Sequence, residues 1–338
     1  MSRLAELSRF SAIGLLAVVL LMVIWSAPAL AQVPGRDPLL VKSLALELNL
    51  EAPTEHRLGE LEYLGGLVLA SADGRFGGYS GLSVDADGAG LWAVSDRGHW
   101  LRLDFARDAA GIPTGIASAT LAPLLDQAGK PLTGRRADAE ALRRDRSGGF
   151  LVSFEREHRV WRYASPQEKP EPVPIPEHVK QLPANGGLES LAVLPDGRLV
   201  LIGEEALSGQ DAVSPLWIGA ESAWRQLGWP QYQGFRPTDA VALPDGGLLV
   251  LERDFRWAAG WAARLSRVGP EDLKARPGTL LAPALLAEWA RPYANDNLEA
   301  LDLRPGPDGR PWLYLMSDDN HSRFQRTLLL VFRLPENQ

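Results

Sequence analysis

The stretch NGGLESLAVLPDGRLVLIGEE, residues 185–205, has the pattern of a β-hairpin. Two apolar runs flank the tripeptide PDG, and Asp-Gly readily adopts the positive φ angles of a tight hairpin turn. The first run contains Glu189 near its start, and the second run ends at Glu204 and Glu205. Because the two ends of an antiparallel hairpin lie side by side, Glu189 and Glu204 are expected to be neighbours.

The same plan of apolar strand, glycine-containing turn and second apolar strand occurs in five segments. An anchor residue near the start of each segment recurs every 49 to 60 residues. This period is too long for one hairpin and suits a four-stranded blade of a β-propeller. The segments begin at Ser80, Asp138, Gly187, Thr238 and Asn297, and their anchors are Gly81, Glu140, Glu189, Asp239 and Glu299.

The sequence therefore predicts an all-β protein, a β-propeller of four-stranded blades with five recognisable repeats. After the last hairpin one further strand remains, RTLLLVFRL at 326–334, so the outer strand of that blade must come from elsewhere. We expect it to be LEYLGGLVLAS at 61–71, which would close the ring with strands from both termini and remove an open sheet edge. The apolar segment 40–50 could form a further strand beyond those that five blades need, so a sixth blade stays possible.

Residues 1–31 have the pattern of a secretory signal peptide. Two arginines precede the apolar run SAIGLLAVVLLMVIW, and the small residues Ala29 and Ala31 form an A-x-A cleavage pattern. An uncleaved membrane anchor is the alternative, but the run is short for a bilayer span. We expect cleavage after Ala31, no stable membrane span afterwards, an N-terminal extension at 32–60 with a possible extra strand, and a propeller domain at 61–338.

Composition excludes several classes of function. The chain has 338 residues, no cysteine and a formal net charge of −7. Disulfides, thiolate metal sites and cysteine nucleophiles are therefore excluded, and the acidic balance lacks the basic surface of a nucleic-acid binder. No G-x-S-x-G, H-E-x-x-H, Walker A or G-x-G-x-x-G motif is present. We expect a monomer in the periplasm of a bacterium or secreted by it, with a small substrate and no nucleic-acid partner.

Propeller symmetry would gather the acidic anchors at one mouth of the central channel. Crowded carboxylates either raise one another's pKa or bind a cation. The alternative is structural, since buried acids also accept hydrogen bonds from neighbouring strands or pair with arginine. The acids predicted to hold a metal ion are Glu140, Glu189, Asp239 and Glu299, and Glu140, Glu189 and Glu299 are also the candidate catalytic carboxylates.

Other polar residues recur at the ends of the hairpins. An acid is followed three residues later by histidine in DRGH, EREH and DDNH, and arginine directly follows an acid in three hairpins. Histidine titrates near neutral pH and arginine binds anionic oxygens bidentately. Packing of the histidines and ion pairs between blades are the structural alternatives. The candidate catalytic histidines are His99 and His158, and the candidate substrate-binding residues are Arg97, Arg156, Arg253, Asn185 and Asn295.

Taken in order, these segments resemble a known family. FGGYSGLSVDADG, EALRRDRSGGFLVSFEREHRVWRY, NGGLESLAVLPDGRLVLIGEE and NDNLEALDLRPGPDGRPWLYLMSDDN, within about residues 61–334, are similar to the phytase-like family described by an esterase-like activity. The resemblance implies a propeller and a hydrolase of esters or phosphoesters. Propeller phytases bind Ca²⁺ through carboxylates, and Ca²⁺ is expected here by that analogy. Asp239 departs from the pattern because it stands where a glutamate is expected.

Two functions follow as hypotheses. The first is an exported, metal-assisted hydrolase of small anionic or ester substrates that uses the acids at the channel mouth. The second is a non-catalytic periplasmic propeller that binds a ligand or serves as a scaffold. A propeller fold serves both functions, so the fold by itself does not choose between them.

Overall fold

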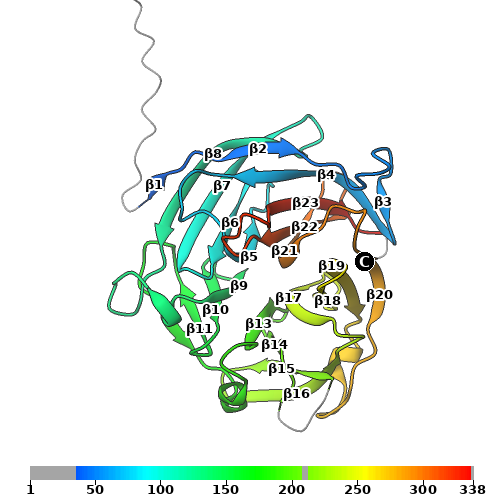
Figure 1. Ribbon diagram of the computed structural model, residues 1–338. Coiled ribbons are helices and arrows are strands. Elements are labelled where there is room, and N and C mark those ends of the chain that lie inside the picture. The colour runs from blue at the N-terminus through cyan, green and yellow to red at the C-terminus, as the bar shows by residue number, and fades with distance from the viewer. Residues whose placement is uncertain (1–35, 208–211, 336–338) are drawn as a thin grey trace, which may run out of the picture. The chain divides into compact units, whose positions relative to one another are not determined.

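The computed structural model describes residues 36–207 and 212–335, so the predicted signal peptide lies outside the described residues. The described chain forms five antiparallel sheets, which Figure 1 shows set around a common centre in chain order. The prediction of an all-β propeller with five blades is confirmed. The inner strands are β5 (Tyr79–Val84), β9 (Ala139–Arg144), β13 (Leu188–Val193), β17 (Arg236–Ala242) and β21 (Asn297–Pro305).

Each sheet continues outward from its inner strand by antiparallel pairing. The second strands are β6 (Gly90–Ser95), β10 (Phe150–Phe154), β14 (Leu199–Gly203), β18 (Leu248–Arg256) and β22 (Pro311–Asp318). The third strands are β7 (His99–Arg107), β11 (Arg159–Tyr163), β15 (Val213–Ala220), β19 (Gly260–Val268) and β23 (Thr327–Arg333). The outer strands are β8 (Pro113–Pro123), β12 (Glu171–Val173), β16 (Ala223–Pro230), β20 (Ala284–Trp289) and β4 (Leu61–Ala70).

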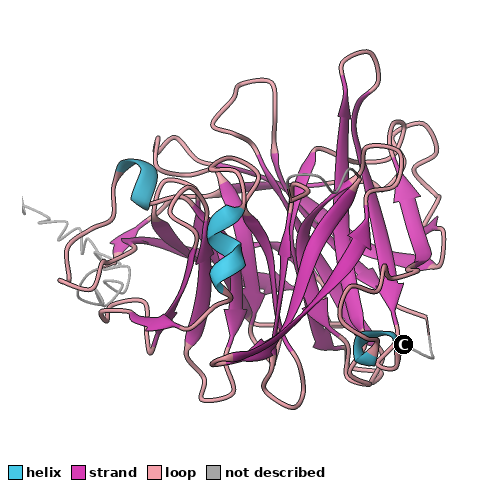
Figure 2. Cartoon of the chain, turned by 90° about the horizontal axis from the view of Figure 1, so that it is seen from below, coloured by secondary structure: helices cyan, strands magenta, loops and turns pink. Residues whose placement is uncertain are grey.

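Short elements complete the described chain. β1 (Asp37–Pro38) extends the first sheet, and β2 (Lys42–Ala45) and β3 (Arg57–Leu58) both pair with β4. Figure 2 shows three short 3₁₀ turns beside the sheets, at Gly134–Arg136, Glu177–Gln181 and Asp272–Lys274. Within the described residues no helix is long and apolar enough to cross a membrane.

Large apolar side chains fill the space between neighbouring sheets. Between the first and second sheets, Trp92 and Trp100 meet edge to face with ring centroids 6.1 Å apart, and Phe150 packs against both. Such pairs add stabilisation beyond the burial of area alone. Each inner strand also contacts the inner strands of both neighbouring blades. The hairpins are therefore held in fixed positions around the channel.

The strand pairing predicted for the last blade is present. β4 runs antiparallel to β23, with Leu69 opposite Thr327 and Glu62 opposite Arg333, and Figure 1 shows the blue strand beside the red one. The sixth blade considered from the sequence is not formed by the described residues. The segment 40–50 contributes β2, which pairs with the outer edge of β4 because that edge is otherwise open.

Every hairpin shifts its register by one residue near the start of its inner strand. A β-bulge of this kind inserts one unpaired residue and re-aims its side chain. We call the inserted residues the bulge positions: Ser80, Glu140, Glu189, Thr238 and Glu299. On the second strand of each hairpin, one residue pairs with the residue just before the bulge. We call the residue that follows it the facing position. The facing positions are Asp96, Glu155, Glu204, Arg253 and Asp318.

The bulges correct two of the predicted anchors. Gly81 and Asp239 were aligned with the glutamates, but each lies one residue beyond its bulge position. Because side chains alternate between the two faces of a strand, an offset of one residue sends the side chain in another direction. The structural counterparts of Glu189 are therefore Ser80 and Thr238.

Candidate functional site

Three glutamates occupy bulge positions near the starts of inner strands. Glu140, Glu189 and Glu299 come from the second, third and fifth blades and are 5–8% exposed. Burial raises the pKa of Glu189, and the charges of Glu140, Glu204 and Glu299 raise it further. At the remaining bulge positions Ser80 and Thr238 are buried, and the Thr238 hydroxyl lies 3.3 Å from the carbonyl oxygen of Leu298. We call these glutamates and the acids beside them the acidic group; their shared role as one site stays a prediction.

The tightest part of this group consists of Asp138, Glu140 and Glu155. One carboxylate oxygen from each residue lies within 4.8 Å of the other two, and all three residues are buried. Glu155 also accepts hydrogen bonds from the backbone N–H groups of Gly186 and Gly187. A Cβ at Gly187 would lie 2.0 Å from the His158 ring, so a larger residue there would displace His158.

The environment disfavours negative charge on several of these acids. Burial raises the pKa of Glu140 well above its ordinary range, and the neighbouring carboxylates Asp138 and Glu299 raise it further. Burial also raises the pKa of Glu189 and of Asp318 well above the ordinary range, again with added repulsion from nearby acids. Such a cluster either keeps protons or binds a cation. Carboxylate oxygens at this spacing fit a hard divalent cation such as Ca²⁺.

Arg253 is the only cation at the bulge and facing positions. Its Nη1 lies 2.6 Å from Asn297 Oδ1 and 3.0 Å from Glu299 Oε1, and Asn297 Nδ2 donates to the same Glu299 oxygen at 2.7 Å. Burial opposes its charge, but Glu299, Glu204 and Glu189 outweigh burial and raise the pKa of Arg253. Arg253 therefore pairs directly with only some of these acids, Glu299 and, at 3.5 Å, Glu204.

Asp239, predicted as a fourth metal ligand, makes a separate ion pair. Its Oδ1 lies 2.7 Å from Arg143 Nη2, and its carboxylate accepts hydrogen bonds from the N–H groups of Ala240 and Leu301. Arg143 also donates to the carbonyl oxygens of Ala240 and Leu82. Both side chains are almost fully buried. This pair ties inner strands together, so we do not include Asp239 in the metal site.

The two predicted histidines lie in different surroundings. His158 Nε2 donates to the Pro183 carbonyl oxygen at 2.9 Å, beside the glycines that Glu155 binds. His99 lies near Arg75 and Asp73, and burial followed by the charge of Arg75 lowers its pKa. Their catalytic roles stay predictions.

The other predicted substrate-binding residues are dispersed. Arg156 binds the carboxylate of Asp138, and Arg97 and Asn185 are exposed. Asn295 donates from Nδ2 to the Trp261 carbonyl oxygen at 2.8 Å. Of the predicted cations, only Arg253 and Arg156 therefore contact the acidic group.

Sequence reasoning missed several members of the site. Asn297 is completely buried and links Arg253 to Glu299. His321 Nε2 lies 3.7 Å from Asp96 Oδ1, one of the facing positions. The repeated acid-x-x-His pattern contains His321, so the signal was present in the sequence. It did not show which of the three histidines lies next to an acid of the channel mouth.

The raised pKa values predict how the stability of metal-free protein depends on pH. Glu140, Glu189 and Asp318 bind protons more readily in the folded protein than in the unfolded chain, so their contribution is complete below about pH 4 and is lost as the pH rises through their folded pKa values. We expect the melting temperature of metal-stripped protein to fall between pH 5 and pH 8. Circular dichroism melts check this, and a melting temperature that rises over this range would contradict it.

Comparisons with known proteins identify a family. A family model described as "Phytase-like: Esterase-like activity of phytase" matches residues 74–321. Among curated proteins, none matches the sequence significantly.

Solved structures with a similar fold have low sequence identity. They include a protein provisionally assigned as a gluconolactonase (14% identity, 88% of this chain and 94% of that chain covered, TM-score 0.44). A luciferin-regenerating enzyme shares 13% identity, with 77% and 93% covered and a TM-score of 0.40. Virginiamycin B lyase from Staphylococcus aureus shares 9% identity, with 88% and 100% covered and a TM-score of 0.41. Likeness at this level says nothing about activity.

Proposed function

The chain belongs to the phytase-like family, and on that premise we propose that it is a metal-assisted hydrolase of esters or phosphoesters. The observation that carries the proposal is the buried group of Asp138, Glu140 and Glu155, whose carboxylate oxygens lie within 4.8 Å of one another. Glu189 and Glu299 occupy the same bulge position as Glu140, in the third and fifth blades.

The proposed metal ligands are Asp138, Glu140 and Glu155, and the proposed ion is Ca²⁺. A hard cation suits an all-oxygen donor set, and ligation relieves the repulsion that raises the pKa of Glu140. Backbone N–H groups hold Glu155 and Arg156 holds Asp138, so two of the three ligands are already oriented. Bound Ca²⁺ supplies Lewis-acid polarisation of a carbonyl or phosphoryl oxygen.

The chain's own residues supply the remaining functions. Arg253 keeps its charge and is fixed by Asn297 and Glu299, so it is available to stabilise negative charge on a substrate oxygen. Burial raises the pKa values of Glu189 and Asp318 well above their ordinary ranges, which favours the protonated forms. A protonated acid of this kind acts as the general acid toward the leaving oxygen.

Turnover of simple chromogenic substrates tests this proposal. Purified protein should hydrolyse 4-nitrophenyl acetate or 4-nitrophenyl phosphate in the presence of Ca²⁺. Chelation with EDTA should remove the activity, and added Ca²⁺ should restore it. If neither substrate is turned over at any Ca²⁺ concentration, the hydrolase proposal fails and the ligand-binding propeller becomes the better explanation.

We further propose that the protein is exported and loses residues 1–31. This proposal rests on the basic residues near the N-terminus, the apolar run and the A-x-A pattern that ends at Ala31. Intact-mass spectrometry of the protein from a periplasmic or culture-medium fraction should give the mass of a chain that begins at Gln32. Full-length protein held in the membrane fraction would contradict this.

A further inference from the structure

A pocket of about 410 Å³ lies where the inner strands end, away from the bulge positions near their starts. The last residue of every inner strand contributes to its lining, so all five blades meet around it. We call it the far pocket. These last residues are Val84, Arg144, Val193, Ala242 and Pro305.

The charged residues of the lining are three arginines and one aspartate: Arg143, Arg144, Arg304 and Asp302. Arg143 forms the buried ion pair with Asp239 described above. Arg144 Nη2 lies 3.2 Å from Asp85 Oδ1. Two of the three cations therefore have a carboxylate partner within the chain.

Asp302, the acid of the lining, is held by backbone groups. Its Oδ2 accepts a hydrogen bond from the Val84 N–H at 2.8 Å, and its Oδ1 accepts one from the Leu303 N–H at 2.9 Å. Burial raises the pKa of Asp302, although the charges of Arg143 and Arg144 act to lower it. The partners of this carboxylate are therefore groups other than Arg304.

Arg304 is the third cation, and it is 7% exposed. Among the described residues, no carboxylate oxygen lies within 4.0 Å of its guanidinium nitrogens. Its Nε donates to the Tyr314 hydroxyl at 2.9 Å, its Nη1 donates to the Pro305 carbonyl oxygen at 3.0 Å, and its guanidinium carbon lies 4.7 Å from the centroid of the Trp312 ring. These neutral groups fix the guanidinium but do not neutralise it, and a buried charge without a counter-charge is costly.

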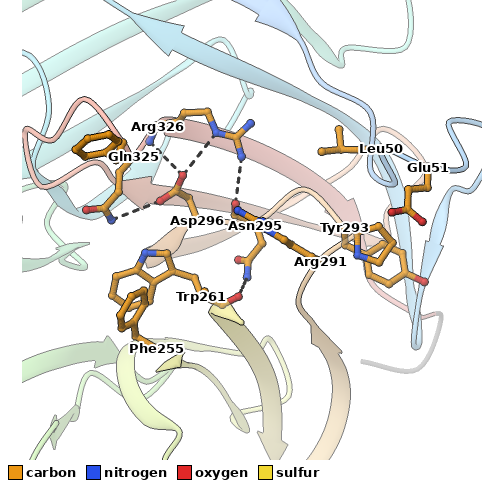
Figure 3. A pocket seen from close by; sticks show the side chains of 13 residues that line it. Leu50, Glu51, Phe255, Trp261, Arg291, Tyr293, Asn295, Asp296, Gln325 and Arg326 are labelled. Carbon is orange, nitrogen blue, oxygen red and sulfur yellow. Dashed lines mark hydrogen bonds and ion pairs between the residues drawn. The ribbon is translucent and has the colours of Figure 1, made fainter. Parts of the chain in front are cut away.

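A larger pocket, of about 730 Å³, shows a different arrangement. There the Arg326 Nε lies 3.6 Å from Asp296 Oδ2, and the backbone N–H of Arg326 donates to the same oxygen at 3.1 Å (Figure 3). Arg326 thus has its counter-charge within the chain. Arg304 needs one from outside.

The turn between β5 and β6 brings Arg144 and Arg304 to the same part of the far pocket. Arg144 contacts Asp85 at the start of this turn. Gly88 follows, and its N–H donates to the Asp85 carbonyl oxygen at 2.8 Å. A Cβ at Gly88 would lie 2.2 Å from the guanidinium carbon of Arg304, so the arginine packs directly on this glycine. Ala86 of the same turn lines the pocket between these contacts in sequence.

We propose that the far pocket binds a small oxyanion, a phosphate or carboxylate group, which compensates the charge of Arg304. Guanidinium groups bind such anions through paired N–H···O bonds, and partial burial strengthens the attraction. Arg304 and Arg144 supply the donors, and the buried Ser83 in the lining adds a hydroxyl group. None of the described acids of the acidic group lines this pocket, so the inference does not depend on the proposed hydrolase function.

Anion titrations of metal-stripped protein test the inference. At constant ionic strength set with NaCl, inorganic phosphate should raise the melting temperature of the parent saturably, and chloride alone should not. Arg304→Met should weaken the apparent affinity for phosphate at least about tenfold, since charge-assisted hydrogen bonds are lost. Arg144→Gln changes a side chain that is 38% exposed, so folding should tolerate it, and it should weaken the affinity about three- to tenfold.

Arg264→Met is the matched control. Arg264 is 8% exposed and stacks on the Tyr232 ring at 4.2 Å, but it does not line the far pocket, so this variant should keep the phosphate affinity of the parent. Acetate serves as the carboxylate probe. A response to phosphate alone supports a phosphate group as the ligand, and a response to both anions supports any small oxyanion.

Three results would overturn the inference. The first is the lack of a saturable response to either anion in the parent. The second is a response that folded Arg304→Met retains or, if that variant does not fold, one that Arg144→Gln leaves at the value of the parent. The third is an equal loss of affinity in Arg264→Met.

Discussion

Replacing Glu140 by glutamine is expected to abolish Ca²⁺-dependent hydrolysis. Glu140 is one of the three acids of the proposed metal site, whose carboxylate oxygens lie within 4.8 Å of one another. Glutamine keeps the size and removes the charge, so Ca²⁺ affinity should fall by at least about 100-fold, the upper range seen when a residue outside the ligand sphere is lost. The metal-free variant should be at least as stable as the parent, since a buried acid with a raised pKa is gone. Hydrolysis assays and thermal melts with and without Ca²⁺ measure both effects.

Glu252→Gln provides the matched control for that substitution. Glu252 is 2% exposed, and burial raises its pKa too, but it lies outside the acidic group and accepts hydrogen bonds from Trp229 Nε1 and the Ser266 hydroxyl. This variant should keep the Ca²⁺ response of the parent even if its stability changes. A Glu140→Gln variant that retains full Ca²⁺-dependent activity would show that the proposed ligand set is wrong.

Replacing Arg143 by methionine should lower the free energy of unfolding by about 3–5 kcal/mol, as expected when one partner of a buried ion pair is removed. Asp239 would then remain fully buried without its counter-charge. In the parent, burial raises the pKa of Asp239 to about 7, even though Arg143 acts to lower it. Urea unfolding monitored by fluorescence measures the loss. The loss should be greater at pH 8 than at pH 6, because protonation relieves an unpaired carboxylate.

The double variant Arg143→Met, Asp239→Leu separates the ion pair from packing. Replacing both partners by apolar side chains should recover much of the stability lost in the single variant, because no isolated charge remains. It should also remove the extra loss at pH 8. If Arg143→Met is as stable as the parent at both pH values, the pair does not hold the inner strands together.

The architecture could be predicted because each repeated hairpin is determined by one short, continuous stretch of sequence. Apolar runs around glycine-containing turns indicated the five blades, and the unmatched strand at 326–334 led to its partner at 61–71. Grouping of Glu140, Glu189 and Glu299 followed from the same repetition. These features depend on spacing and on alternation along strands, which a sequence shows directly.

The bulges could not be predicted, and they decide which side chains meet. In the fourth repeat the sequence aligned Asp239 with the glutamates, whereas the bulge position holds Thr238 and the facing position holds Arg253. No turn residue marks such a one-residue shift, because it arises from pairing between strands. The buried contacts of Asn297 and Arg143 likewise depend on other blades, whose residues are far away in sequence.

The central claim is that the acidic group at the channel mouth binds Ca²⁺. Isothermal titration of metal-stripped protein with CaCl₂ at pH 7.5 tests it most directly. We predict saturable binding in the parent and in Glu252→Gln, and strongly weakened binding in Glu140→Gln. Ligand binding to the native state should also raise the melting temperature as the Ca²⁺ concentration increases. Absence of a saturable heat in the parent, together with an unchanged melting temperature, would contradict the claim.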